Sequence, residues 1–377
     1  MYFFYLQIKL CSTLDFIPNS NDGHDILIGG GHSEDNLFGN DGNDFAAGDC
    51  VTIEFFADYH ISSIISIAEE FGENDNITMG NGDDFAIGGT GHPLGGDIIK
   101  GDDGNDILLG DSGEILFYHT ELNATGDADS PGYLWNVPNS TVAITCEHGN
   151  MDEIDGGNGI DYIIAGAFDK YVDSGNGTDL VFGDHGSIIM SEDFPYKLLS
   201  AETTFSTCTP GNDTITLGEG DDIGFGGGLD GDTIWGNAGR DLIVGDFAVI
   251  KFYSSVPNDT DPLIPYPRSI DTLTCDDGGE DFLYGGDGVD YIIAGALDDT
   301  VDSGAGMDLV FGDHGYILLS EDTPYKLVFA NSTDISCKPG VDFITLGEGH
   351  DIAFGGKYQK YDCALGSCFV LWELFAD

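Results

Sequence analysis

Aspartate and glycine recur together at a fixed spacing, and bends rich in both can hold a metal ion. Between Gly278 and Gly315, the residues Asp281, Asp290, Asp299 and Asp308 stand nine positions apart. Each lies in a unit of the form G-G-x-G-x-D-x-U-x, with U a large apolar residue, and GGDGVDYII is a clean copy. Carboxylate and carbonyl oxygens in flexible turns favour calcium over zinc, copper or magnesium. The spacing therefore predicts a series of calcium sites.

The same spacing runs through most of the chain, with one extra residue between Asp222 and Asp232 and a turn lengthened by HPLG between Asp84 and Asp97. Lys170 occupies a position where an aspartate is due, which should weaken or abolish the site shared with Asp152 unless the adjacent Asp169 substitutes. The predicted metal ligands are Asp25, Asp35, Asp44, Asp75, Asp84, Asp97, Asp106, Asp152, Asp161, Asp179, Asp213, Asp222, Asp232, Asp241, Asp281, Asp290, Asp299, Asp308, Asp342 and Asp351.

These units predict an all-β fold, a parallel β-roll or β-solenoid of nine-residue repeats. Glycines permit a tight turn in six residues, and the other three residues are extended, with the apolar side chain pointing inward. Two units make one flattened coil, and stacked coils share a core that no single unit can bury. Turns two units apart should then lie over one another. The predicted partners are Asp25 with Asp44, Asp75 with Asp97, Asp84 with Asp106, Asp161 with Asp179, Asp213 with Asp232, Asp222 with Asp241, Asp281 with Asp299, and Asp290 with Asp308.

Each block of repeats ends in a GDxxxI segment, which we interpret as a closing unit without its ligand. The isoleucines of these segments are Ile53, Ile115, Ile188, Ile250 and Ile317. A longer period of 129 residues relates DYIIAGAFDK to DYIIAGALDD. Between blocks, polar excursions should pack as loops or short strands along one edge of the rod. We therefore divide the chain into an N-terminal flank (1–20), repeat blocks (21–115), an excursion (116–151), two repeat modules (152–279 and 280–356) and a divergent tail (357–377). The tail fits a capping end, a secretion signal or, as we favour, a truncated or mispredicted gene.

The unit GGxGxDxUx resembles the RTX family of hemolysin-type calcium-binding nonapeptide repeats. The resemblance covers most of residues 21–356. It implies a parallel β-roll with calcium between successive turns and calcium-triggered folding outside the cell. Such regions are often accessory parts of secreted toxins, proteases, lipases, epimerases or adhesins. This chain differs in its eight cysteines, its short interrupted blocks and Lys170.

Composition and net charge argue against some classes of binding partner. The formal net charge is −57, from 11 Lys+Arg against 68 Asp+Glu, so the basic surface that nucleic acid requires is absent, and anionic membranes are disfavoured too. The 41% hydrophobic content argues against plain disorder. The chain contains no run of about 20 apolar residues, so no transmembrane helix is predicted. An even number of cysteines suits disulfides in an oxidising, extracellular compartment, with Cys146–Cys208 and Cys275–Cys337 as first choices and the connectivity open.

Several segments imitate catalytic motifs, but we predict no enzyme. GDSGE around Ser112 resembles a serine-protease nucleophile segment, yet it occupies the register of the closing units and has no evident His/Asp partners. His185 and His314 are interpreted as surface turn residues. We expect a secreted calcium-binding rod with a structural or adhesive role, whose partners include extracellular matrix, glycan or cell surface. The alternative is a non-catalytic accessory region of a larger secreted enzyme or toxin, such as a protease, lipase or epimerase.

Overall fold

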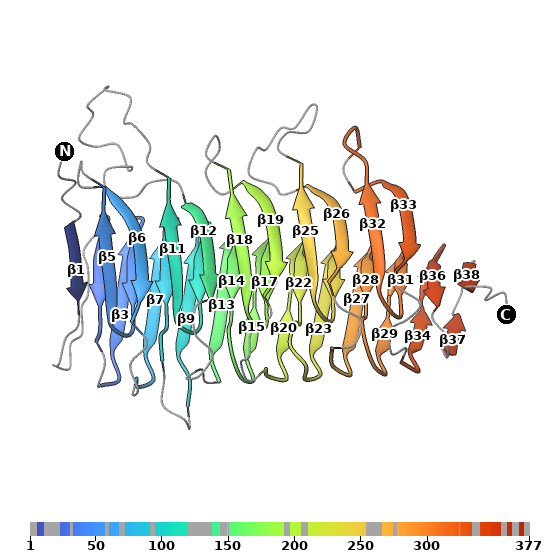
Figure 1. Ribbon diagram of the computed structural model, residues 1–377, viewed down its shortest axis with the longest axis horizontal. Helices are drawn as coiled ribbons and strands as arrows, with labels where there is room; N and C mark the ends of the chain where they lie inside the picture. The colour runs from blue at the N-terminus through green and yellow to red at the C-terminus, as the bar shows by residue number, and fades with distance from the viewer. Residues whose placement is uncertain are drawn as a thin grey trace.

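A computed structural model gives the arrangement of the chain as a rod of short strands (Figure 1). The residues that the structure describes are 6–10, 23–30, 33–56, 60–67, 72–90, 95–118, 138–143, 149, 151–191, 197–204, 210–253, 266–273, 277–323, 325–333, 340–355, 360–363 and 369–372.

Each nine-residue unit forms one short strand directly after its aspartate, as the x-U-x pattern predicts. Successive units alternate between two parallel sheets, so that one coil contributes one strand to each. We call them the outer sheet and the middle sheet. The alternation confirms the predicted all-β fold of a parallel β-roll.

The outer sheet contains β3 (Asn36–Asp41), β7 (Asn76–Asn81), β9 (Ile98–Asp103), β13 (Glu153–Gly159), β15 (Tyr171–Asp173), β16 (Asn176–Gly177), β20 (Thr214–Thr216), β21 (Glu219–Gly220), β23 (Thr233–Gly239), β27 (Phe282–Gly288), β29 (Thr300–Asp302), β30 (Ala305–Gly306), β34 (Phe343–Leu346), β35 (Glu348–Gly349) and β37 (Lys360–Cys363). The middle sheet contains β2 (Ile26–Ile28), β4 (Phe45–Ala47), β8 (Phe85–Ile87), β10 (Ile107–Leu109), β14 (Tyr162–Ile164), β17 (Leu180–Phe182), β22 (Ile223–Phe225), β24 (Leu242–Val244), β28 (Tyr291–Ile293), β31 (Leu309–Phe311), β36 (Ile352–Gly355) and β38 (Phe369–Trp372).

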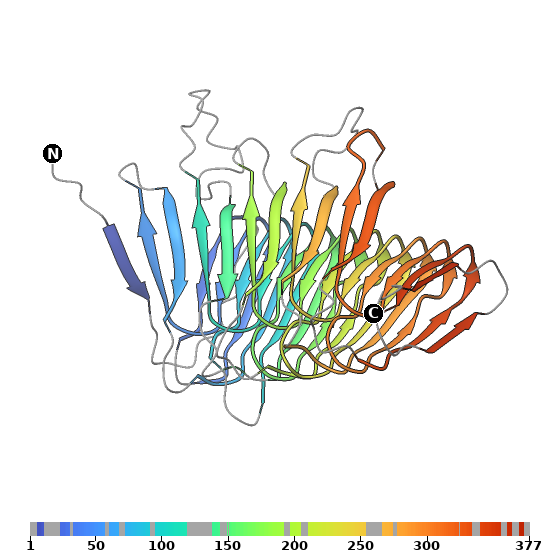
Figure 2. The same cartoon turned by 45° about the vertical axis from the view of Figure 1, so that its right-hand side comes forward.

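A third sheet, which the sequence did not predict, covers the far side of the middle sheet. It is antiparallel and built from the closing segments and the excursions, which pair as hairpins rather than lying along one edge. We call it the hairpin sheet; its strands stand upright in Figures 1 and 2. They are β1 (Leu6–Leu10), β5 (Val51–Phe55), β6 (Ile61–Ser66), β11 (Gly113–Phe117), β12 (Pro138–Ala143), β18 (Gly186–Met190), β19 (Leu198–Thr203), β25 (Ala248–Phe252), β26 (Pro267–Thr272), β32 (Gly315–Leu319) and β33 (Leu327–Ser332).

The middle sheet is buried on both faces, and its alternation explains why. In β14, Ile163 packs in one core with Ile154 of the outer sheet, whereas Tyr162 and Ile164 pack in a second core with Ile188 of the hairpin sheet. Successive side chains of a strand point to opposite faces, so all three residues of β14 are buried. The closing isoleucines are therefore core residues of a second layer, and their regular recurrence reflects that packing.

One hairpin leaves the rod for every two coils. The middle sheet and the hairpin sheet therefore gain the same number of strands along the rod. Two coils give two middle strands, and one hairpin gives two hairpin-sheet strands. Neighbouring strands are about 4.8 Å apart in any sheet, so the two layers keep the same repeat along the rod. The hairpin strands follow the order β5-β6-β11-β12-β18-β19-β25-β26-β32-β33.

The strands near the end of the chain extend the same sheets. β37 pairs in parallel with β34 of the outer sheet, and β38 pairs in parallel with β36 of the middle sheet. The divergent tail thus supplies one more pair of strands in the register of a coil. No helix in the described part of the chain is long and apolar enough to cross a membrane.

Candidate metal-binding site

Aspartates on adjacent coils form two ladders along the rod. In each step between two aspartates, the backbone N–H of one donates to Oδ1 of the aspartate in the next coil, over 2.6–3.2 Å. The middle ladder precedes the middle-sheet strands and contains Asp25, Asp44, Asp84, Asp106, Asp161, Asp179, Asp222, Asp241, Asp290, Asp308 and Asp351. The outer ladder precedes the outer-sheet strands and contains Asp35, Asp75, Asp97, Asp152, Lys170, Asp213, Asp232, Asp281, Asp299 and Asp342.

All eight pairs expected from the sequence lie on adjacent coils of one ladder. The structure also places aspartates from different blocks on adjacent coils, which the sequence analysis did not pair. This happens because each hairpin returns the chain to the same register of the ladder. Asp44 thus follows onto Asp84, 40 residues later, and Asp106 onto Asp161, 55 residues later. Every residue predicted as a metal ligand occupies a ladder position.

The second oxygen of most ladder carboxylates is buried and has no hydrogen-bond partner in the described structure. Examples are Oδ2 of Asp75, Asp84 and Asp106. These oxygens lie against turn glycines and beside backbone carbonyls: Oδ2 of Asp75 and the carbonyl oxygen of Gly88 both approach the position of a Cβ on Gly48. A buried oxygen without a donor costs free energy. A cation beside the carboxylate and the carbonyl would remove that cost.

Most ladder carboxyls have raised pKa values, because burial disfavours their charged form. Burial first, and then the charges of Asp161 and neighbouring Asp84, raise the pKa of Asp106 to about 9. Burial and the charges of Asp222 and Asp161 raise the pKa of Asp179 to about 9. The hydrogen bond from the preceding aspartate lowers the pKa in each case but does not cancel the effect of burial. At neutral pH the ladders thus require protons or bound cations to offset their charge.

This oxygen-only donor set fits calcium. Ca²⁺ accepts carboxylate and carbonyl oxygens in a flexible geometry, as these turns provide. Within the described ranges, no group of three or more His, Cys, Asp or Glu side chains converges to hold a metal. The oxygens that lie together at a turn are one carboxylate oxygen and one backbone carbonyl, as Oδ2 of Asp75 and the carbonyl of Gly88 do at Gly48.

Sequence comparison agrees with this chemistry. The model of the RTX calcium-binding nonapeptide repeat matches four times, at residues 94–114, 209–231, 227–247 and 276–310. The chain carries RTX calcium-binding repeats. No curated protein matches it. The matched RTX segments contain ladder residues such as Asp106, Asp222 and Asp290, together with the turn glycines that precede them.

Lys170 interrupts the outer ladder of RTX repeats but remains part of it. Its backbone N–H donates to Oδ1 of Asp213 over 2.8 Å, as an aspartate would. Its ammonium is buried, 2.5 Å from Oδ2 of Asp152 and 3.3 Å from Oδ2 of Asp111. Asp169 does not substitute in the ladder, since its Oδ1 accepts the exposed N–H of Asn212. Burial tends to lower the pKa of Lys170, but the charges of Asp111 and Asp152 outweigh it and the pKa is raised.

A third set of aspartates was missed at the sequence level. We call Asp49, Asp111, Asp184, Asp246 and Asp313 the closing aspartates, because each is the Asp of a GDxxxI segment. Oδ2 of Asp111 accepts the N–H of Ala167 over 2.5 Å, and Oδ2 of Asp246 accepts that of Ala296 over 2.5 Å. Each thus holds a turn of the following coil. Their invariant place in the closing segments was the available signal, but we interpreted those units as lacking a ligand.

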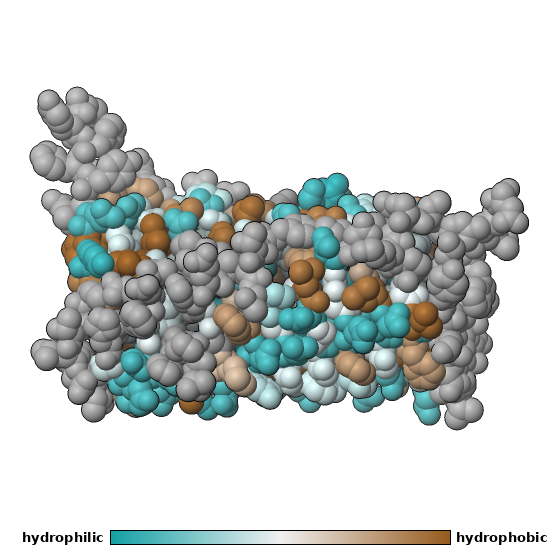
Figure 3. Space-filling view, turned by 60° about the horizontal axis from the view of Figure 1, so that its bottom comes forward, coloured by the Kyte–Doolittle hydropathy of each residue, from teal (hydrophilic) through white to brown (hydrophobic). Residues whose placement is uncertain are grey.

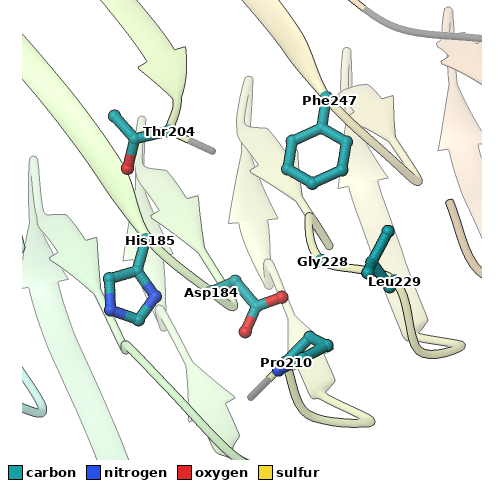
Figure 4. Close-up of a pocket in the computed structure, with 7 residues that line it drawn as sticks. All are labelled: Asp184, His185, Thr204, Pro210, Gly228, Leu229 and Phe247. Carbon is teal, nitrogen blue, oxygen red and sulfur yellow. The ribbon is translucent and has the colours of Figure 1, made fainter. Parts of the chain in front are cut away.

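The residue after each closing aspartate is a core position, which corrects one expectation. His185 and His314 are buried, with 5% and 3% of their surface exposed, and are not surface turn residues. Cys50, Ser112 and Phe247 occupy the same register and are buried as well, because the chain turns there beneath the hairpin sheet. Figure 4 shows Asp184 between His185 and Pro210, with Phe247 of the next closing segment beyond. These residues border a space of about 30 Å³. The proposed pairs Cys146–Cys208 and Cys275–Cys337 lie outside the described residues.

Proposed function

We propose that this protein is an extracellular calcium-binding rod whose RTX repeats fold when calcium occupies the turns beside its aspartate ladders. One observation carries the proposal: the buried Oδ2 atoms, which have no donor within the described structure, recur at successive ladder positions, from Asp44 to Asp351. They lie beside turn carbonyls in both ladders.

Electrostatics supports calcium-dependent folding. A chain with a net charge of −57 repels itself when compact, and its ladders concentrate that charge in the interior. A divalent ion at each turn would neutralise the carboxylates and supply the missing partner for Oδ2. Because the ladder geometry does not exist in the unfolded chain, the free energy of ion binding would contribute to folding.

The proposed role is structural or adhesive, without catalysis. Hydrophilic residues and scattered hydrophobic ones share the described surface in Figure 3, and the hydroxyl of Ser112 is buried, where a substrate would not reach it. A rod of stacked coils suits a spacer or a surface that contacts matrix, glycan or another cell. Secretion is supported by Cys50, which is disulfide-bonded, since disulfides persist in oxidising compartments.

The second candidate is an accessory region of a larger secreted enzyme or toxin, for which the four RTX matches are the support. The two candidates share the same calcium chemistry. They differ in whether the full transcript encodes a catalytic domain, so sequencing the full-length transcript decides between them.

Far-UV circular dichroism of the purified chain tests the calcium requirement. We expect excess chelator at neutral pH to abolish most of the β-signal and added calcium to restore it. Magnesium at the same concentration is the control, and we expect it to restore little, because Mg²⁺ gives up its water reluctantly and demands strict octahedral geometry. An unchanged cooperative melt in chelator would refute the proposal.

A further inference from the structure

Two aromatic side chains stack on the outward face of the outer sheet. Trp235 of β23 and Tyr284 of β27 lie in register on adjacent strands, with ring centroids 5.7 Å apart and ring planes inclined by 8°. The residues before them, Ile234 and Leu283, are buried in the core between the outer and middle sheets. Because successive side chains of a strand point to opposite faces, the two rings stand on the face turned away from that core, where both are partly exposed.

Each ring has a second face that the other ring does not cover. The rings stack along the rod, so the second face of Tyr284 is directed towards β29 and that of Trp235 towards β20. Asp302 of β29 lies in register with Tyr284, and Thr216 of β20 lies in register with Trp235. Asp173 of β15 lies in register with Thr216. A carboxylate therefore borders the stack directly on one side and one strand further away on the other.

The charge around the stack has a single sign. The described outer-sheet strands from β15 to β35 contain no lysine or arginine. They carry Asp173, Glu219, Asp287 and Glu348 with exposed side chains and Asp302 with a partly exposed one. None of these residues belongs to a ladder, so calcium at the ladder turns would leave this surface charge in place. The surface is therefore complementary to a cationic partner.

An arginine of the chain itself shows which cation suits an aromatic ring beside a carboxylate. The guanidinium of Arg240 lies 4.4 Å from the centroid of the Tyr325 ring and donates to Oδ2 of Asp221 over 2.6 Å. A guanidinium is planar, so it can stack on an aromatic face while its edge donates to a carboxylate, and a lysine ammonium cannot do both in this way. Tyr284 and Asp302 offer the same two groups on an exposed surface.

We propose that an arginine-rich, extended segment of a partner protein binds along this face of the outer sheet, with one guanidinium stacked on Tyr284 and paired with Asp302. Oδ1 of Asp302 also accepts the N–H of Gly304 over 3.3 Å, which orients the carboxylate. Further arginines of the segment would meet neighbouring carboxylates such as Asp287 and Asp173. The inference rests on the proposed adhesive role, for which it names the chemistry of the partner, and it uses no ladder carboxylate.

A synthetic peptide of alternating arginine and glycine is the probe, titrated into the calcium-loaded protein by isothermal titration calorimetry. We expect saturable binding that is tighter than that of the lysine analogue, because only the guanidinium both stacks and donates from its edge. Tyr284→Ala and Asp302→Asn should each weaken binding by about 2- to 5-fold. Asparagine at this position can still accept the N–H of Gly304. Tyr284→Phe keeps the ring and should bind the peptide nearly as well as the wild type.

Two variants outside the stack are the controls. Tyr171→Ala removes a tyrosine that is 55% exposed on the same sheet but stands in the row of Thr214, outside the row of the stacked rings. Glu202→Gln removes one charge from the hairpin sheet. Both should bind the peptide as the wild type does, and far-UV circular dichroism in calcium confirms that each variant is folded.

Three results would overturn the inference: no saturable binding to the folded wild type, equal losses in the controls and the stack variants, or binding of a neutral oligosaccharide in place of the peptide. Each of these leaves calcium-dependent folding standing, because the circular dichroism signal reports it separately. A wild type that has no β-signal in calcium would remove both the proposed function and this inference.

Discussion

The backbone N–H of Asp241 donates to Oδ1 of Asp290 over 3.0 Å, although 49 residues separate the two in sequence. The hairpin formed by β25 and β26 lies between them, and the ladder passes it without a gap. The middle ladder is therefore one uninterrupted series of hydrogen bonds from Asp25 to Asp351. A change at one carboxylate should be felt by the coils on both sides of it.

Replacing Asp241 by asparagine should reduce the stabilisation that calcium provides. The amide oxygen can still accept the N–H of Asp222, which now bonds to Oδ1 over 3.0 Å, but the negative charge at Oδ2 is lost. At a calcium concentration 100 times Kd, one ion contributes about 2.7 kcal/mol. We expect the unfolding free energy in saturating calcium to fall by about that amount relative to the wild type, measured by urea denaturation.

Glu202→Gln is the control for this charge change. Glu202 is exposed on β19 of the hairpin sheet, away from both ladders. Its loss of charge should leave the calcium-dependent stabilisation unchanged. Equal effects from the two variants would show that net charge alone matters and that the ladder does not.

The metal-free protein should be more stable in acid than at neutral pH. The pKa values of Asp84 and Asp179 are raised from 3.8 to about 8 and about 9 in the folded chain, through burial first. A raised pKa means that the folded state binds more protons than the unfolded state, so this stability is complete below the unfolded pKa and is lost as pH rises through the folded value. The window of loss is about pH 4 to 9.

Far-UV circular dichroism in chelator between about pH 5 and pH 8 measures this dependence. We expect the folded fraction to fall with rising pH, so that most of the β-signal is lost by neutral pH, and we expect saturating calcium to abolish the fall, since the ion replaces the protons. A metal-free β-signal that rises with pH would contradict the assignment of these carboxyls as neutral in the unloaded fold.

The closing isoleucines should be as important as the core of the β-roll. Ile188 of β18 is fully buried between the hairpin and middle sheets, whereas Ile189 is 43% exposed on the same strand. We expect Ile188→Ala to cost about 2–5 kcal/mol of unfolding free energy, because it leaves a cavity. Ile189→Ala should cost about 0.5 kcal/mol or less. Urea denaturation in calcium compares the two directly, and equal costs would argue against the second layer.

Turn glycines should not tolerate substitution by alanine where adjacent coils approach each other. Gly220 has a φ of +155°, and a Cβ there would collide with the carbonyl oxygen of Gly177 in the adjacent coil. Gly23 has a φ of +140°, but no atom of the described residues lies within 4 Å of its Cβ position. Backbone strain of this kind costs about 1–3 kcal/mol. Gly23→Ala should show this strain alone, and Gly220→Ala should lose more stability in calcium, as monitored by thermal melts.

The nine-residue spacing was enough to predict the strands, the two parallel sheets and the adjacent pairs within a block. It could not predict that Asp44 meets Asp84, because the intervening excursion has its own length and no periodicity. Nor could it predict the hairpin sheet. The alternation in β18, where Ile188 is buried and Ile189 exposed, is that of a half-buried strand, but five residues are too few to show which surface it covers.

The partial errors at Lys170 and the closing aspartates have one cause. Both concern contacts between residues that a single unit does not contain: the ammonium of Lys170 reaches Asp111, 59 positions earlier in sequence. A repeat pattern identifies only the residues that the units have in common. These contacts are made by residues that differ from one unit to the next. The same holds for His185, which is buried by a hairpin outside its own unit.

Because one hairpin serves two coils, the rod can change length only by pairs. Removal of a single coil would leave one strand of the hairpin sheet without a middle strand to cover, and its apolar side chains would face water. The 129-residue repeat obeys this restriction, since the ladder from Asp161 to Asp290 advances by four coils. A shortened or extended version of the protein should therefore be cut or joined at two-coil intervals, which makes the double coil the natural unit for engineering rods of chosen length.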